Sequence, residues 1–172
     1  SSKYQNLTKQ AKELLEMQKE MVDQHQDFVD AGNEFMHWLR TAKERMGKCA
    51  EPTGDKDTIS GKATVLKMLQ NEQEEGQTKL AKAFQLAEKA CNLADDEDKE
   101  VIEEEVAFLQ DEFDKFLTQV GKTKNLLEMG IVKWTEYEDK FKECEEWLST
   151  MEEKVQCYNK LQNTVQEKRA VL

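Results

Sequence analysis

The feature that most constrains this chain is a regular spacing of apolar residues between Ile102 and Tyr158. The positions alternately four and three residues apart are Ile102, Val106, Leu109, Phe113, Phe116, Val120, Thr123, Leu127, Gly130, Trp134, Tyr137, Phe141, Cys144, Leu148, Met151, Val155 and Tyr158. Only Thr123 and Gly130 are neither apolar nor aromatic. A repeat averaging about 3.5 residues keeps one face of a helix against partner helices as they supercoil. One helix with this pattern would be roughly 85 Å long, which predicts a rod rather than a compact globule.

The same spacing opens the chain and predicts a first helix over about residues 3–48. Its positions are Tyr4, Leu7, Ala11, Leu14, Gln18, Met21, His25, Phe28, Gly32, Phe35, Leu39, Ala42, Met46 and Cys49. Pro52 and Gly54 then predict a turn, because both residues interrupt helices. A second helix is expected over about residues 58–94. Its middle is rich in glutamine and contains Gly76, which costs up to ~1 kcal/mol relative to alanine in a helix.

A third long helix is expected over about residues 97–156, after a short acidic turn at residues 95–98. Acidic residues at the start of a helix favour its dipole, and an aspartate there caps free backbone N–H groups. Residues 159–163 are expected to turn the chain, and residues 165–172 to open another helix.

Two dipeptides reveal an internal repeat. Trp38-Leu39 and Trp147-Leu148 lie 109 residues apart, and the same offset places Tyr4 on Phe113 and His25 on Trp134. The two apolar patterns stay in phase over their whole overlap, so the first and third long helices are interpreted as equivalent parts of one repeating unit.

This pattern resembles the spectrin repeat family, whose features are a Trp-Leu pair in the first of three helices and a period slightly above one hundred residues. The last helix of each such repeat continues into the next. The tryptophan usual in the third helix is replaced here by Phe113 and, one repeat earlier, by Tyr4. The resemblance implies an all-α fold of left-handed, three-helix coiled-coil bundles joined by continuous helices, with Trp38 and Phe113 in one core.

The resemblance also implies a division of the chain. Residues 1–22 would end the third helix of a preceding repeat, and residues 23–131 would form one complete repeat. Residues 132–172 would contain the first helix of a following repeat and the beginning of its second.

The function that the resemblance implies is that of a non-enzymatic rod segment in a giant cytoskeletal scaffold, which sets distance, carries tension and presents helical faces to other proteins. Spectrins, dystrophin-like proteins, plakins and nesprins contain such repeats. The long period and the polar seam positions favour a nesprin-like scaffold that links the nuclear envelope to actin. Expected partners are adjacent repeats and actin-associated or actin-regulating proteins, with formins as one candidate. The expected location is the cytoplasmic cytoskeleton, or the outer nuclear membrane through the parent protein.

Composition excludes several other classes of protein. The formal net charge of −11 disfavours nucleic acid and anionic lipid as partners. No apolar run approaches the ~18 residues of a membrane span, so direct membrane insertion is not expected. The four cysteines, Cys49, Cys91, Cys144 and Cys157, have no C-x-x-C spacing and are interpreted as buried small hydrophobes in a reducing cytoplasm.

Convergent catalytic groups are not evident. His25 and His37 are the two histidines, and the chain contains no glycine-rich phosphate loop and no G-x-S-x-G turn. His25 occupies a seam position, which favours packing over catalysis. Asp55-Lys56-Asp57 with Gly61 superficially resembles a calcium loop, but the position that requires glutamate is Leu66. We therefore expect no enzyme activity, no cofactor and no metal.

Two surfaces are candidates for protein binding. The first is the acidic cluster of Asp95, Asp96, Glu97, Asp98, Glu100, Glu103, Glu104 and Glu105. It would dock a basic partner surface, or it would be only a solvated helix start. The second is the junction at residues 126–134, where Leu127 and Ile131 would line a groove for a partner helix or would be covered by neighbouring loops.

A different class of hypothesis is a homo-oligomer whose long helices pair between chains. The predicted turns at residues 52–55 and 95–98 favour folding back within one chain instead.

Overall fold

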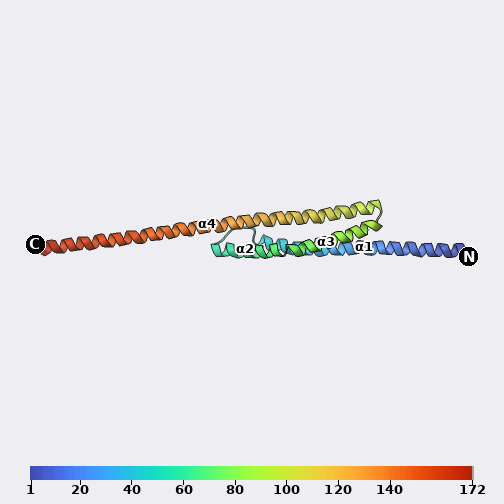
Figure 1. Cartoon of the computed structure of the whole chain (residues 1–172), viewed down its shortest axis with the longest axis horizontal. Coiled ribbons are helices and arrows are strands. Elements are labelled where there is room, and N and C mark those ends of the chain that lie inside the picture. Colours follow the sequence, from blue (N-terminus) through green and yellow to red (C-terminus); the bar gives the residue numbers. More distant parts are fainter. Residues whose placement is uncertain (172) are drawn as a thin grey trace.

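The computed structural model describes residues 1–171 and contains four helical segments with no strand in that range. They are α1 (Ser2–Gly47), α2 (Lys56–Asn71), α3 (Gln73–Leu93) and α4 (Asp96–Val171). The molecule is a thin rod with its two termini at opposite ends (Figure 1). The predicted all-α bundle and the predicted first helix are both confirmed.

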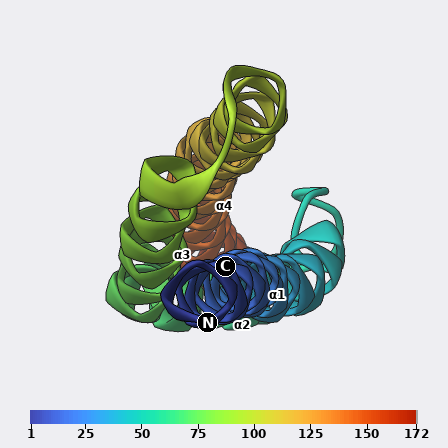
Figure 2. The ribbon, with the colours of Figure 1, turned by 90° about the vertical axis from the view of Figure 1, so that its right-hand side faces the viewer.

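The chain folds back twice, so that α1, the α2–α3 pair and α4 form the three arms of one bundle. Helix α1 packs chiefly on α3, while α4 packs on both α2 and α3. The end-on view in Figure 2 shows α3 beside both α1 and α4, with the start of α4 standing apart from α1. The core is therefore built from three arms, although α1 and α4 contact each other less than either contacts the middle arm.

Both turns are fixed by aspartate caps. Asp55 accepts hydrogen bonds from the backbone N–H and the hydroxyl of Thr58, at 2.8 and 2.6 Å. These bonds stabilise the carboxylate and lower the pKa of Asp55. Asp95 accepts from the backbone N–H of Asp98 at 2.8 Å. Each cap satisfies an N–H group that the helix itself leaves free, and the predicted turns are found where the sequence places them.

The middle arm differs from the single helix that the sequence predicts. Helix α2 ends at Asn71 and α3 begins at Gln73, with Glu72 between them. Arg45 of α1 donates two hydrogen bonds to the Glu72 carboxylate, at 2.6 and 3.2 Å. The interruption is one residue whose backbone stays in the right-handed helical region, and it lies in the glutamine-rich middle that the sequence marks as weak.

Helix α4 is longer than predicted. It spans 76 residues, roughly 114 Å, without interruption. The turn expected at residues 159–163 is wrong, because the helix continues through this range. This stretch is polar but contains neither glycine nor proline, so nothing in it prevents helical backbone. The helix expected to open at residue 165 is the continuation of α4, and Leu172 lies outside the described residues.

An aromatic cluster occupies the centre of the bundle. The rings of Trp38 and Phe113 lie 6.2 Å apart, as the repeat pattern predicts. Phe35 meets Phe113 edge-on at 5.7 Å, and Trp38 meets Phe116 edge-on at 6.0 Å. Such edge-on and tilted pairs add about 0.5–1.5 kcal/mol each to the effect of burying the rings.

Gly76 leaves room for the Trp38 indole because it has no side chain. A Cβ atom built on Gly76 would overlap the Cζ3 and Cη2 atoms of Trp38 and lie 2.9 Å from its Cζ2 atom. The indole therefore lies directly on the backbone of α3. Gly76 is the residue of the middle arm that the sequence marked as a cost, and its absent side chain is what lets α1 and α3 pack here.

The two ends of the rod carry the apolar pattern beyond the bundle. On α4, residues up to Leu127 are buried in the core, whereas Tyr137, Phe141 and Leu148 are 59, 54 and 53% exposed. On α1, Tyr4 and Leu7 are likewise 76 and 65% exposed. We call these segments, residues 1–20 and 135–170, the N-terminal and C-terminal extensions.

The cysteines differ in their surroundings, which corrects the expectation that they are all buried. All four are free, with Cys49 buried, Cys91 half-buried, and Cys144 and Cys157 exposed on the C-terminal extension. The latter two occupy that extension, where no helix of this chain covers them.

Alkylation with a maleimide at neutral pH is expected to modify Cys144 and Cys157 first and Cys49 last. Burial raises the pKa of the Cys49 thiol and of the Cys91 thiol, which reduces the reactive thiolate. Mass spectrometry of peptides from a time course would give the order. In denaturant the four rates should converge. A native Cys49 as reactive as Cys144 would contradict the packing at the end of α1.

Candidate binding surfaces

The predicted acidic cluster lies where α4 begins, at the end of the bundle. Its residues are all exposed: Asp95, Asp96, Glu97, Asp98, Glu100, Glu103, Glu104 and Glu105. Asp95 caps the helix, and Asp98 and Glu105 face α1 across two adjoining hollows. The acidic residues therefore do not form one continuous binding surface, because only Asp98 and Glu105 line a hollow shared with α1.

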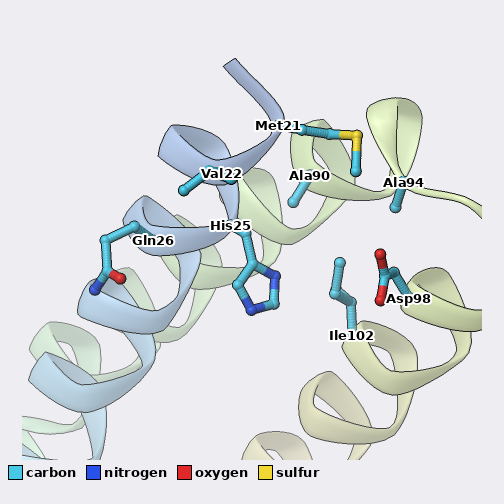
Figure 3. A pocket seen from close by; sticks show the side chains of 8 residues that line it. All are labelled: Met21, Val22, His25, Gln26, Ala90, Ala94, Asp98 and Ile102. Carbon is cyan, nitrogen blue, oxygen red and sulfur yellow. The ribbon is translucent and has the colours of Figure 1, made fainter. Parts of the chain in front are cut away.

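The first hollow is a pocket of about 250 Å³ at the end of the bundle, shown in Figure 3. Its lining residues come from α1 and from the two ends of the α3–α4 turn: Met21, Val22, His25, Gln26, Ala90, Ala94, Asp98 and Ile102. Figure 3 shows His25 on the α1 side and Asp98 on the α4 side, with Ile102 below. One imidazole and one carboxylate at a mostly aliphatic opening do not form a catalytic constellation.

The second hollow is a groove of about 260 Å³ between α1 and α4, which we call the α1–α4 groove. Its lining residues are Phe28, Val29, Gly32, Asn33, Met36, Glu105, Phe108 and Leu109. Phe108 is 54% exposed although it is a large aromatic residue of the bundle. The sequence alone did not indicate this groove. Phe108 lies outside the four-and-three spacing, and that departure was the available signal.

The junction residues have two different fates. Leu127 is fully buried, and with half-buried Ile131 it contributes to a hollow against Ala63 and Leu66 of α2. A Cβ built on Gly130 would lie 3.5 Å from atoms of both Pro52 and Ile59, which is ordinary packing distance. The α1–α2 turn therefore covers this side of α4, where Leu127 and Ile131 lie.

The outer side of the same junction remains exposed. Leu126, Met129 and Val132 are 47, 56 and 56% exposed and follow one another at three-residue steps. Beyond them, Lys56 of α2 forms an ion pair with Glu138 at 2.7 Å, which ties the turn to the beginning of the C-terminal extension. The exposed apolar surface at the junction is thus this strip, and Leu127 lies beneath it.

Neither a metal-binding cluster nor a membrane-spanning helix is found among the described residues. Within residues 1–171, no group of three His, Cys, Asp or Glu side chains is placed to hold a metal ion. None of the helices described there is both long enough and apolar enough to cross a membrane. What the geometry offers is apolar grooves and strips with charged edges, which are surfaces for contact with other helices.

Comparison with known proteins finds a relative that is much longer than this chain. It is 53% identical over all 172 residues to Muscle-specific protein 300 kDa of Drosophila melanogaster. The chain spans about 1% of the length of that curated relative. No protein-family model matches the chain, and no solved structure matches it. An all-α bundle similar to a small part of a giant muscle protein is consistent with a repeat segment of a large rod protein.

Proposed function

We propose that this chain is a non-enzymatic, spectrin-like rod segment of a large cytoskeletal scaffold, which acts as a spacer, bears tension and presents surfaces to other proteins. The observation that carries the proposal is the course of α4. Its apolar face is buried in the bundle up to Leu127 and then continues in the same phase to Tyr158 on the C-terminal extension. One helix thus supplies a finished core and the beginning of the next one.

The equivalent residues of the repeat support this reading. Leu39 is 1% exposed in the bundle, whereas Leu148, 109 residues later, is 53% exposed. Trp38 lies on Gly76 in the core, while Trp147 is 59% exposed. In our proposal, helices of adjoining repeats cover these residues, and the chain divides into residues 1–22, 23–131 and 132–172 as the sequence pattern predicts.

A rod of this kind transmits force along continuous helices. Helix α1 is continuous from residue 2 to residue 47 as it enters the bundle, and α4 is continuous from residue 96 to residue 171 as it leaves. Tension along the rod therefore passes through hydrogen-bonded helical backbone. Stacked units that contact only their neighbours are typical of repeat proteins.

The finer assignment that we propose is a nesprin-like scaffold between the nuclear envelope and actin. Its support is the long repeat period, the polar seam positions and the similarity to a giant muscle protein. Actin-regulating proteins, formins among them, are the partners that this assignment proposes. Immunoprecipitation of the full-length protein from muscle, with actin regulators and nuclear-envelope proteins as readouts, tests it, and their absence would count against it.

A second candidate is a homo-oligomer that uses the exposed seams of the two extensions, including Tyr4, Leu7, Tyr137 and Leu148. Light scattering over a wide concentration range separates the two candidates. A monomer at all concentrations supports the rod segment, and a stable dimer would favour the second candidate.

The direct test of the rod proposal uses a longer piece of the parent protein that continues beyond Leu172. In that piece, hydrogen exchange of residues 135–165 should slow markedly relative to this chain, because new helices cover the seam. Unchanged exchange in the longer piece would contradict the proposal.

A further inference from the structure

The α1–α4 groove is an apolar surface that the bundle leaves open. Phe28 and Leu109 form its buried floor, at 1 and 6% exposure, and Val29 and Met36 line the α1 wall. Phe108 forms the α4 wall and keeps 54% of its surface exposed. The groove exists because α1 packs chiefly on α3, so that α1 and α4 diverge on the side away from the middle arm.

The backbone of α1 lies close to α4 at Gly32, beneath this groove. A Cβ built on Gly32 would be 3.6 Å from the Cδ1 atom of Leu109, so the two helices are already at packing distance beneath the opening. The groove is therefore a shallow trough with a closed apolar floor. Such a surface accepts side chains that project from one face of a partner element.

The groove is flanked by negative charge at the end nearest the start of α4. Residues 95–105 of α4 and its preceding turn contain eight carboxylates and one lysine. Residues 20–39 of α1 contain five carboxylates and no lysine or arginine. The two helical segments that flank the groove therefore carry net negative charge, and Glu105 belongs to the lining itself. The carboxylate of Glu34 is engaged by Lys79 of α3 at 2.8 Å.

The opposite end of the groove, toward the end of α1, carries positive as well as negative charges. Lys43 of α1 donates to Glu112 of α4 at 2.6 Å, which joins the two helices two turns beyond Met36 and one turn beyond Phe108. This ion pair lowers the pKa of Glu112 through the hydrogen bond from Lys43. Arg40 adds an exposed positive charge on the same side of α1. The groove is thus closed and less acidic at this end, so its charge runs from strongly negative to nearly balanced.

We propose that the α1–α4 groove binds a basic amphipathic helix of a partner protein. The apolar face of that helix, with large aliphatic side chains at i, i+3 or i+4 and i+7, contacts Val29, Met36 and Phe108. Its lysines and arginines lie toward Glu105 and the start of α4, where they meet the negative end of the groove. This binding site is separate from the rod function, which uses the two extensions.

The extensions themselves do not match this description of the partner. Residues 135–170 are acidic on balance, so that the C-terminal extension of a second copy would bring negative charge against negative charge. Residues 1–20 contain four lysines and three glutamates, which is close to balance and supplies little excess positive charge. The complementary ligand is an element with excess positive charge.

The probe is a fluorescent peptide of about 18 residues with leucines on one helical face and lysines along both edges. There are two control peptides. The first has the same composition with the positions of its leucines scrambled, and the second has glutamate in place of every lysine. We expect the first peptide to bind the whole chain more tightly than the scrambled peptide at moderate salt, and the glutamate peptide not to bind.

Matched substitutions locate the site. Phe108→Asp is expected to weaken binding by at least about tenfold. Phe141→Asp, on the same helix and also 54% exposed, should leave the affinity within about twofold. Glu105→Lys should weaken binding and flatten its salt dependence, whereas Glu146→Lys on the C-terminal extension should not. Circular dichroism confirms that each variant is folded, which is expected because all four side chains are exposed.

A photo-reactive group on the apolar face of the peptide gives the position directly. Cross-links to residues 28–36 and 101–109 support the proposal. Cross-links to residues 4–22 or 137–165, or equal affinities for the Phe108→Asp and Phe141→Asp variants, would overturn it. Equal binding of the scrambled peptide would overturn it as well, because it would show general attraction of basic chains without use of the groove.

Discussion

Gly76→Ala is expected to destabilise the bundle even though alanine forms helices better than glycine. The new methyl group would overlap the Trp38 indole, and forcing extra volume into a packed core costs about 1–3 kcal/mol. Replacing glycine by alanine in a helix contributes up to ~1 kcal/mol in the opposite direction. The steric cost should exceed that gain, so the free energy of unfolding should fall by about 1–2 kcal/mol.

The same substitution should become stabilising once the indole is removed. Trp38→Ala alone should cost about 3 kcal/mol, because the ring packs with Phe113 and Phe116. In that background Gly76→Ala fills free space and should raise the free energy of unfolding by up to ~1 kcal/mol. Urea unfolding of the four proteins of this cycle, followed by circular dichroism, measures the change of sign.

Gly61→Ala is the matched control for that cycle. Gly61 is a helical glycine of α2 with no atom near a built Cβ, so alanine there should stabilise the protein in both backgrounds. An effect of Gly76→Ala with the same sign whether Trp38 is present or absent would show that the indole does not lie on Gly76.

Leu39→Ala should lower the free energy of unfolding by about 3 kcal/mol, within the 2–5 kcal/mol typical of buried leucines. Leu39 is 1% exposed on α1, so its removal leaves a cavity in the core. Leu148 occupies the equivalent position of the repeat but is 53% exposed. Leu148→Ala in this chain should therefore change the free energy by less than about 0.5 kcal/mol.

Leu39 and Leu148 can be compared directly, because each follows a tryptophan and each has the same predicted role in its repeat. Chemical unfolding of both variants measures the difference between them. A large cost at Leu148 in this chain would mean that the C-terminal extension is covered, most simply by a second copy. In a longer piece of the parent protein the rod proposal requires the cost at Leu148 to approach that at Leu39.

Much of the fold could be predicted because it depends on local spacing. The four-and-three pattern gives the long helices and the core positions of α1 and α4, from Phe28 to Met46 and from Ile102 to Leu127, without knowledge of the tertiary structure. It fails in α3, where Ala83 and Ala90 are buried although they lie outside the four-and-three spacing. The turns follow from Pro52, Gly54 and the aspartate caps, which act on their own sequence neighbours. The contact of Trp38 with Phe113 is the one that the resemblance to spectrin repeats implies, in which the two rings share one core.

The features that could not be predicted depend on contacts between segments distant in sequence. Gly76 is a poor helix residue by itself, and its value appears only when Trp38 of another helix is placed against it. The interruption at Glu72 involves Arg45, 27 positions earlier in the chain. The expected turn at residues 159–163 was inferred from polarity, which also suits the exposed surface of a continuing helix.

The candidate surfaces divide in the same way. The acidic cluster is visible as a run of residues, and its exposure follows from its charge. Leu127 and Ile131 gave an apolar signal that does not distinguish burial from an open groove, and the structure places Leu127 beneath the surface. The α1–α4 groove depends on how far two helices diverge, which no local pattern specifies.

The uninterrupted helix α4 has a consequence for which changes of length this region can tolerate. Each residue inserted near Gly130 would rotate everything beyond it by about 100°, turning Leu148 and its neighbours away from the direction set by the core. Seven inserted residues would restore the direction to within about 20°. The turn at Thr53 and Gly54 absorbs single insertions instead, since it has no periodicity to preserve. Insertions and deletions within α4 should therefore occur in multiples of seven, while the turns should vary freely in length.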